Sequence, residues 1–161
     1  MRIELLAEDQ WQRYRAIRLR ALRDTPDAFA STYADEEAFP ERRWRQRLTS
    51  GAQTFFAVLG DKDIGSVTGA ARRDQDGVAG LFGMWVALEA RRIGAGNLLV
   101  QSVIDWAFAA GFDQVFLDVA DSNLAAIRPY EQAGFRPTGT VGALPSPREH
   151  VTEHERSLSL R

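Results

Sequence analysis

The chain has no cysteine and only two histidines, His150 and His154, among its 161 residues. The absence of cysteine excludes disulfides, thiolate metal sites and a cysteine nucleophile. Two histidines are too few for a histidine-rich metal centre. We therefore expect no metal site.

Long apolar runs are also missing. No run approaches the roughly 20 residues that a membrane helix needs, and the N-terminus, Met1-Arg2-Ile3-Glu4, does not resemble a signal peptide. The net charge of −2 argues against a general nucleic-acid binder. We therefore expect a cytoplasmic protein with neither a membrane nor a nucleic acid as its partner.

The composition that is present is ordinary for a soluble globular protein, with 45% hydrophobic and 26% charged residues. A chain of 161 residues can bury a substantial core without cross-links. The sequence shows neither an internal repeat nor a linker, so we expect a single domain over residues 1–161.

Hydrophobic periodicity predicts seven strands and four helices. The strands are expected at residues 2–6, 53–59, 64–71, 78–86, 115–119, 135–141 and 153–160, and the helices at residues 10–23, 41–48, 97–110 and 124–133. Turn chemistry makes the second, third and fourth strands consecutive and antiparallel. The fifth strand returns parallel to the fourth through a right-handed crossover. The predicted fold is α/β (α+β), with a mixed, mostly antiparallel central sheet.

A glycine-bearing turn joins the expected strand 78–86 to the long helix that follows it. Gly94 and Gly96 remove side chains at this turn, so backbone N–H groups can converge on a ligand. The first N–H groups of a helix are unpaired and its dipole is positive there, which favours an anion. Arg91 and Arg92 add positive charge. The turn therefore predicts a phosphate or pyrophosphate site.

Other interpretations of this turn remain. The glycines can serve tight packing alone. A P-loop is excluded because Asn97 and Leu98 follow Gly96, where that motif needs lysine and serine or threonine. A dinucleotide fingerprint would need a third glycine where Leu99 stands, although Asp118 could serve as its ribose-binding acid. Dinucleotide binding therefore remains an alternative.

Two sequence blocks, taken in order, resemble the GCN5-related N-acetyltransferase (GNAT) superfamily. The first, Arg91-x-x-Gly94-x-Gly96, is similar to the acetyl-CoA signature of that family. The second is Asn123-x-x-Ala126-x-x-x-Tyr130-Glu131-x-x-Gly134-Phe135. The resemblance implies the GNAT fold and acetyl-CoA as the acyl donor.

The resemblance also implies which residues hold the coenzyme. The pyrophosphate would bind the N–H groups of residues 92–97, and the pantetheine arm would pair with the strand edge at residues 84–86. Asn123 would cap a helix and contact the pantetheine. The implied acetyl-CoA residues are Met84, Trp85, Val86, Arg91, Arg92, Ile93, Gly94, Ala95, Gly96, Asn97, Asn123 and Tyr130.

Acetyl transfer to an amine also needs an acid and a base. Tyr130 matches the position of the general acid in the family, although Pro129 before it is expected to distort the helix. A primary amine with a pKa of about 10.4 must lose a proton before it attacks. The expected strand 78–86 contains no acid, which leaves Glu36, Glu37 and Glu153 as candidates. We take Glu37 as the candidate base.

The sequence therefore predicts an N-acetyltransferase that acts on a primary amine in a ternary complex. The acidic segment Asp35-Glu36-Glu37 is either solvated charge or, as the resemblance implies, part of the acceptor site, where it would favour a cationic small molecule. The missing strand acid leaves a non-catalytic acyl-CoA sensor as the alternative, and a dinucleotide-binding oxidoreductase ranks behind both. A homodimer is a common assembly in the family.

Overall fold

A seven-stranded sheet runs through the computed structural model, which describes residues 1–161. The strands are β1 (Arg2–Leu5), β2 (Gln53–Leu59), β3 (Lys62–Ala71), β4 (Val78–Val86), β5 (Gln114–Ala120), β6 (Arg136–Ala143) and β7 (Thr152–Ser159). The α-helices are α1 (Trp11–Asp24), α2 (Tyr33–Glu37), α3 (Glu41–Arg47), α4 (Ala95–Ala109) and α5 (Leu124–Ala133). The short 3₁₀ helices are η1 (Glu8–Gln10), η2 (Pro26–Ala28) and η3 (Leu88–Ala90).

The strand order is β1-β2-β3-β4-β5-β7-β6, and only the β4–β5 pair is parallel. This order confirms the predicted mixed, mostly antiparallel sheet and the crossover through α4. The seven predicted strands and four predicted helices are all present. None of the helices has the length and hydrophobicity that crossing a bilayer would require.

The two faces of the sheet carry different helices. The helix α4 packs closely on β3 because that strand has Gly65 and Gly69, and a Cβ added to Gly69 would lie 2.9 Å from the ring of Trp106. The helix α1 lies on the opposite face, where the guanidinium of Arg13 is 5.1 Å from the ring centre of Phe56 on β2. One core of 31 buried residues joins the helices to the sheet.

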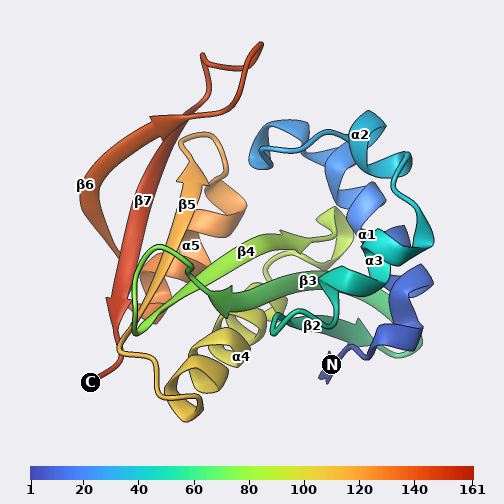
Figure 1. The fold of residues 1–161 in the computed structure, drawn as a ribbon, viewed down its shortest axis with the longest axis horizontal. Helices are drawn as coiled ribbons and strands as arrows, with labels where there is room; N and C mark the ends of the chain where they lie inside the picture. Colours follow the sequence, from blue (N-terminus) through green and yellow to red (C-terminus); the bar gives the residue numbers. More distant parts are fainter.

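Helix α2 was not predicted from the sequence. Its N-cap is Thr32, whose hydroxyl accepts a hydrogen bond of 3.2 Å from the Asp35 N–H. Five residues are too few to show helical periodicity, so the local pattern does not reveal the helix. Figure 1 shows α1, α2 and α3 gathered on one side of the molecule, away from the end formed by β6 and β7.

Glu36 of α2 is fully buried. For this residue, both interpretations of the acidic segment, solvated charge and part of an acceptor site, are therefore wrong. Arg18 donates two hydrogen bonds of 2.9 Å to its carboxylate, and Arg47 donates a third of 2.7 Å. Burial alone would raise the pKa of Glu36, but the two arginines outweigh burial and hold that pKa at about 2. The carboxylate therefore links α1, α2 and α3 and stays ionised.

We expect Glu36→Gln to lower the free energy of unfolding by about 3–5 kcal/mol at pH 7, because it leaves two arginines without their buried partner. Since folding lowers the pKa of Glu36 from 4.5 to about 2, the ion pairs stabilise the fold fully above pH 4.5. The difference between the wild type and the variant should therefore shrink as the pH falls from 4.5 towards 2. Urea unfolding across that range measures it.

Glu41→Gln is the matched control, because Glu41 makes an ion pair of 3.0 Å with Arg45 that is largely exposed. Exposed pairs of this kind contribute about 0.3–0.5 kcal/mol. An equal decrease in the free energy of unfolding in the two variants would contradict a structural role for the buried carboxylate of Glu36.

Candidate active site

Strands β4 and β5 separate after their first few residues. They pair only between Val78–Gly80 and Gln114–Phe116. On its other edge, β4 shifts register against β3 between Ser66 and Thr68, and nearby Gly83 has a φ of 62°. A bulge of this kind bends a strand. The C-terminal half of β4 therefore has a free edge on the β5 side.

Arg91 fixes the separated end of β4. Its Nε donates a hydrogen bond of 3.0 Å to the carbonyl of Val86. The next residue, Arg92, has a φ of 68°, which non-glycine residues rarely adopt. Backbone strain of this kind is concentrated at functional sites.

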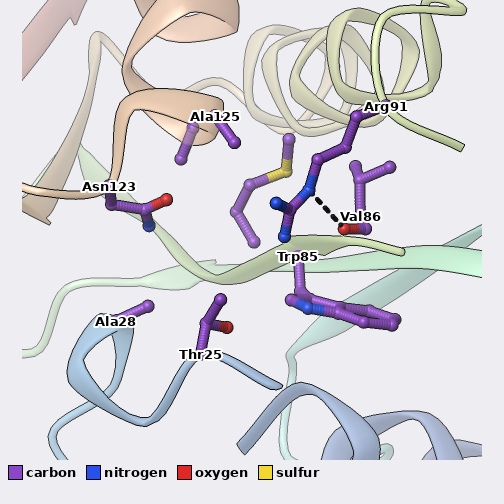
Figure 2. A pocket seen from close by; sticks show the side chains of 9 residues that line it. Thr25, Ala28, Trp85, Val86, Arg91, Asn123 and Ala125 are labelled. Carbon is purple, nitrogen blue, oxygen red and sulfur yellow. Dashed lines mark hydrogen bonds between the residues drawn. The ribbon is translucent and has the colours of Figure 1, made fainter. Parts of the chain in front are cut away.

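A small cavity of about 20 Å³ lies where the two strands separate (Figure 2). Thr25 and Ala28 line it from the segment that follows α1, whereas Asn123 and Ala125 line it from the start of α5. These segments lie on opposite faces of the sheet, so the cavity connects the two faces. Its volume suffices for about one water molecule.

A larger groove of about 880 Å³ lies along α4 and α5. Three of its lining residues are arginines, and only Glu131 is acidic. Its lining residues are Val86, Leu88, Arg91, Arg92, Gly94, Gly96, Asn97, Leu124, Ala125, Ile127, Arg128, Pro129, Glu131 and Gln132. The mixture of cationic and apolar groups suits an elongated anion with apolar parts.

The first turn of α4 faces this groove. Gly94 is the N-cap residue, with a φ of 92°. The Leu98 N–H donates to the Gly94 carbonyl at 3.1 Å, which is the first hydrogen bond of the helix. The N–H groups of Ala95, Gly96 and Asn97 precede it and therefore have no partner within the helix. Together with the helix dipole, they form an anion-binding site.

The two glycines at this turn act differently. A Cβ on Gly94 would meet no atom within 4 Å, so this residue is needed for its left-handed backbone. A Cβ on Gly96 would lie 3.0 Å from Pro129 of α5 and 3.2 Å from the methyl group of Met84. The packing interpretation therefore applies at Gly96, where α4 closely approaches α5 and β4.

Most of the predicted coenzyme residues lie around these two hollows. Those that line one or both are Met84, Trp85, Val86, Arg91, Arg92, Gly94, Gly96, Asn97 and Asn123. Ile93 and Ala95 line neither, since Ile93 is exposed to solvent and Ala95 is buried. The sequence analysis missed Thr25, Ala28 and Arg128, because no local motif marks them.

Asn123 precedes α5, but its side chain does not cap that helix. The structure contains no hydrogen bond from its side chain to the helix, and only its carbonyl accepts from the N–H groups of Ala126 and Ile127. Figure 2 shows the Asn123 amide directed towards the centre of the cavity. Further along α5, Pro129 has no N–H to donate to the carbonyl of Ala125, a second lining residue. The Asn123 side-chain amide and the Ala125 carbonyl are thus available to bind a ligand.

Tyr130 packs within the core beside the site. Its ring makes an edge contact with Phe135, with centres 5.9 Å apart, and it lines neither the cavity nor the groove. Burial raises the pKa of its hydroxyl, which therefore stays protonated. The Tyr130 hydroxyl is not both sealed from solvent and without a hydrogen-bond partner.

The structure does not bring Glu37 to the cavity. Glu37 is exposed at the end of α2, where its carbonyl accepts a hydrogen bond from Arg15, and it lines neither hollow. Glu36 is held by its two arginines. Glu153, the third acid considered from the sequence, also lines neither hollow, but it is the one of the three whose pKa is raised by burial.

Glu153 shares one face of the sheet with two other acids. Asp118 lies opposite Glu155 in the β5–β7 pair, and Glu153 lies opposite Ala120. Opposed residues in antiparallel strands point to the same side, as do residues two apart. Arg156 points to the other side and reaches Glu131 of α5. The three carboxylates therefore lie on the face that carries α1.

The environment of two of these carboxylates, Glu153 and Asp118, favours their neutral forms. Burial, followed by the charge of Asp118, raises the pKa of Glu153, and Arg148 partly offsets this. Burial, followed by the charge of Glu155, raises the pKa of Asp118, and Arg72 partly offsets that. Raised carboxyl pKa values are typical of groups that exchange protons with a substrate.

Arg148 ties the β6–β7 loop to the segment after α1. It donates hydrogen bonds of 2.7, 2.9 and 2.7 Å to the carbonyls of Pro26, Phe29 and Ala30. The α1 face beside Glu153 is therefore enclosed by two segments distant in sequence.

The sequence model of the Acetyltransferase (GNAT) family matches residues 11–135. This match covers most of the chain and includes the glycine turn and α5. The protein therefore belongs to the GNAT acetyltransferase family.

Among curated proteins, the uncharacterized N-acetyltransferase YobR of Bacillus subtilis is 40% identical over 85 residues, covering 53% of this chain and 34% of YobR. The probable N-acetyltransferase camello of Xenopus tropicalis is 33% identical over 99 residues, covering 62% of this chain and 45% of camello. The chain thus spans less than half the length of these relatives.

Solved structures share the fold over the full chain. A GNAT-family acetyltransferase from Streptococcus pneumoniae superposes with a TM-score of 0.83 and 20% identity, covering 99% of both chains. The putative acetyltransferase yncA of Salmonella typhimurium, solved with its cofactor acetyl-CoA, gives a TM-score of 0.78 and 18% identity, covering 100% of this chain and 94% of yncA.

Proposed function

We propose that the protein transfers the acetyl group of acetyl-CoA to a primary amine, by direct attack in a ternary complex. The observation that carries this proposal is the cavity between β4 and β5. It connects the anion-binding groove at α4 to the face that bears Asp118 and Glu153. A thioester that enters from one side can there meet an amine that enters from the other.

The donor would lie along the groove with its acetyl group at the cavity. The unpaired N–H groups of Ala95, Gly96 and Asn97 would bind the pyrophosphate, assisted by Arg92. The pantetheine arm contains amides, so it can pair with the free edge of β4 as an added strand. Membership of the family and the acetyl-CoA-bound yncA support this placement.

The reaction balances with groups that the chain supplies. The amine nitrogen forms a bond to the acetyl carbon, and the bond from that carbon to sulfur breaks. The proton lost by the amine passes to Glu153, directly or through water, and the CoA thiolate takes a proton from Tyr130. The raised pKa of Glu153 makes it a stronger base, whereas the raised pKa of Tyr130 keeps the hydroxyl protonated but makes it a weaker acid.

A cationic acceptor is still favoured, but not because of the acidic segment at residues 35–37, on which the sequence analysis based this expectation. The carboxylates that would attract it are Asp118 and Glu153, since Glu36 is already paired. With Glu153 as the proposed base, the absence of an acid from β4 no longer favours the alternative of a non-catalytic sensor. The dinucleotide alternative lacks the parallel sheet that it would need.

A thiol-release assay with acetyl-CoA and a panel of primary amines tests the proposed function. We expect at least one amine to accelerate CoA release over the rate with water alone, and to gain the mass of one acetyl group. An unchanged rate with every amine, together with intact acetyl-CoA binding, would contradict transfer and support the sensor.

We expect Gly94→Val to weaken acetyl-CoA binding by about ten-fold or more, because valine strains a backbone at a φ of 92° and displaces the N–H groups of α4. Isothermal titration calorimetry measures the affinity. Gly111→Val is the matched control, since Gly111 follows α4 at its other end, has a φ of 91° and is equally uncrowded. Equal binding losses in both variants would contradict the placement of the pyrophosphate.

We expect Glu153→Gln to lower kcat/KM by about a hundred-fold at pH 7, because the amide cannot take the proton of the amine. The wild-type rate should fall as the pH drops through the raised pKa of Glu153, and the variant should lose this limb of the profile. The kcat/KM of the variant should approach that of the wild type in alkaline solution, because the amine there loses its proton without a base.

Glu149→Gln makes the same chemical change on the exposed part of the β6–β7 loop and serves as the control. It should retain the wild-type pH profile. A wild-type profile in Glu153→Gln would exclude Glu153 as the base.

A further inference from the structure

The three arginines of the groove along α4 and α5 come from different elements. The Nε of Arg91 donates to the Val86 carbonyl, and Figure 2 shows its guanidinium among the residues of the cavity between β4 and β5. Arg92 lies in the turn before α4, whereas Arg128 lies on α5, the other helix of the groove. The three cations are therefore placed to contact different parts of an elongated anion.

Arg128 keeps its charge available for a ligand. Its side chain is exposed and takes part in no ion pair within the chain. Glu131 is the one acid that lines the groove, and it follows Arg128 by three residues on α5, a spacing at which helical ion pairs commonly form. Glu131 instead contacts Arg156 of β7 at 3.4 Å. The groove therefore does not neutralise Arg128.

The position of Arg128 along α5 places it near the phosphate end of the groove. The helix begins at the cavity, which Asn123 and Ala125 line. About one turn further along, Pro129 lies against the first turn of α4, since a Cβ on Gly96 would be 3.0 Å from its ring. Arg128 immediately precedes Pro129. Its side chain therefore starts beside the N–H groups that would bind the pyrophosphate, not beside the cavity that would hold the thioester.

Coenzyme A has a second phosphate group, a monophosphate on the 3′ oxygen of its ribose. The N–H groups of α4 and Arg92 would hold the pyrophosphate, which leaves this phosphate without a partner. It is attached beyond the pyrophosphate as seen from the thioester, so it would lie where the groove opens to solvent. A phosphate monoester is largely a dianion at neutral pH, and one guanidinium can pair with two of its oxygens.

We propose that Arg128 binds the 3′-phosphate of the coenzyme, so that the protein distinguishes acetyl-CoA from its 3′-dephospho form. This assignment rests on the proposed function and adds a second phosphate site to the one at the N-terminus of α4. It also gives a role to an unpaired cation that lies outside the glycine turn.

Acetyl-CoA and acetyl-3′-dephospho-CoA test this site, because they differ only in that phosphate. Isothermal titration calorimetry measures both affinities. The wild type should bind acetyl-CoA about ten-fold more tightly, the value of one charge-assisted contact at an exposed position. In Arg128→Gln the affinity for acetyl-CoA should fall until the two are nearly equal, while the affinity for the dephospho form stays unchanged.

Two further substitutions of arginine by glutamine are the controls. Arg92→Gln should weaken the binding of both coenzymes by a similar factor, because both contain the pyrophosphate. Arg42 is exposed on α3 and lines neither the cavity nor the groove. Arg42→Gln removes the same charge as Arg128→Gln and should leave both affinities unchanged.

The inference would be overturned, while acetyl-CoA binding itself stands, if the wild type bound the two coenzymes equally or if Arg128→Gln kept the wild-type ratio. A ratio that Arg42→Gln lowers as much as Arg128→Gln would also overturn it, because the cause would then be net charge and not contact. If the wild type binds neither coenzyme, the proposed function fails, and this inference fails with it.

Discussion

The site depends on the separation of two parallel strands. Pairing between β4 and β5 ends at Gly80, and the bulge at Gly83 directs the rest of β4 away. A continuous sheet would block passage from one face to the other. Because the strands part, backbone groups of β4 are free to pair with a peptide-like ligand, and a cavity can open between the faces. The hydrogen bond from Arg91 to Val86 holds the separated end in place.

The two faces then provide different chemistry. The α4–α5 side is lined by arginines and unpaired N–H groups, which suit a large anion. The α1 side bears Asp118 and Glu153, which suit a cation that must lose a proton. Two sets of polar contacts enclose the α1 side: the buried ion pairs of Glu36 join its three helices, and Arg148 joins the β6–β7 loop to the segment after α1. Both sets of contacts are used for structure, and together they fix the shape of the α1 side.

The sequence analysis was most accurate where structure is decided locally. The glycine turn placed Gly94 at the start of α4, and alternation or helical periodicity identified all seven strands and the four longer helices. It failed for the acidic segment 35–37, where Glu36 is buried between two arginines and Glu37 is exposed away from the cavity. Charge in a sequence does not reveal its partners, and Arg18 lies 18 residues away.

By itself, the sequence determined the order of the elements, the anion-binding turn and the family, because each depends on residues close together in the chain. Only the tertiary structure decided which acids share the α1 face of the sheet and which N–H groups remain unpaired. The positions of Asp118 and Glu153 depend on the register between β5 and β7. The unpaired state of the Trp85 indole N–H depends on the packing of this side chain against α1. Such contacts join residues far apart in sequence, where spacing along the chain carries no information.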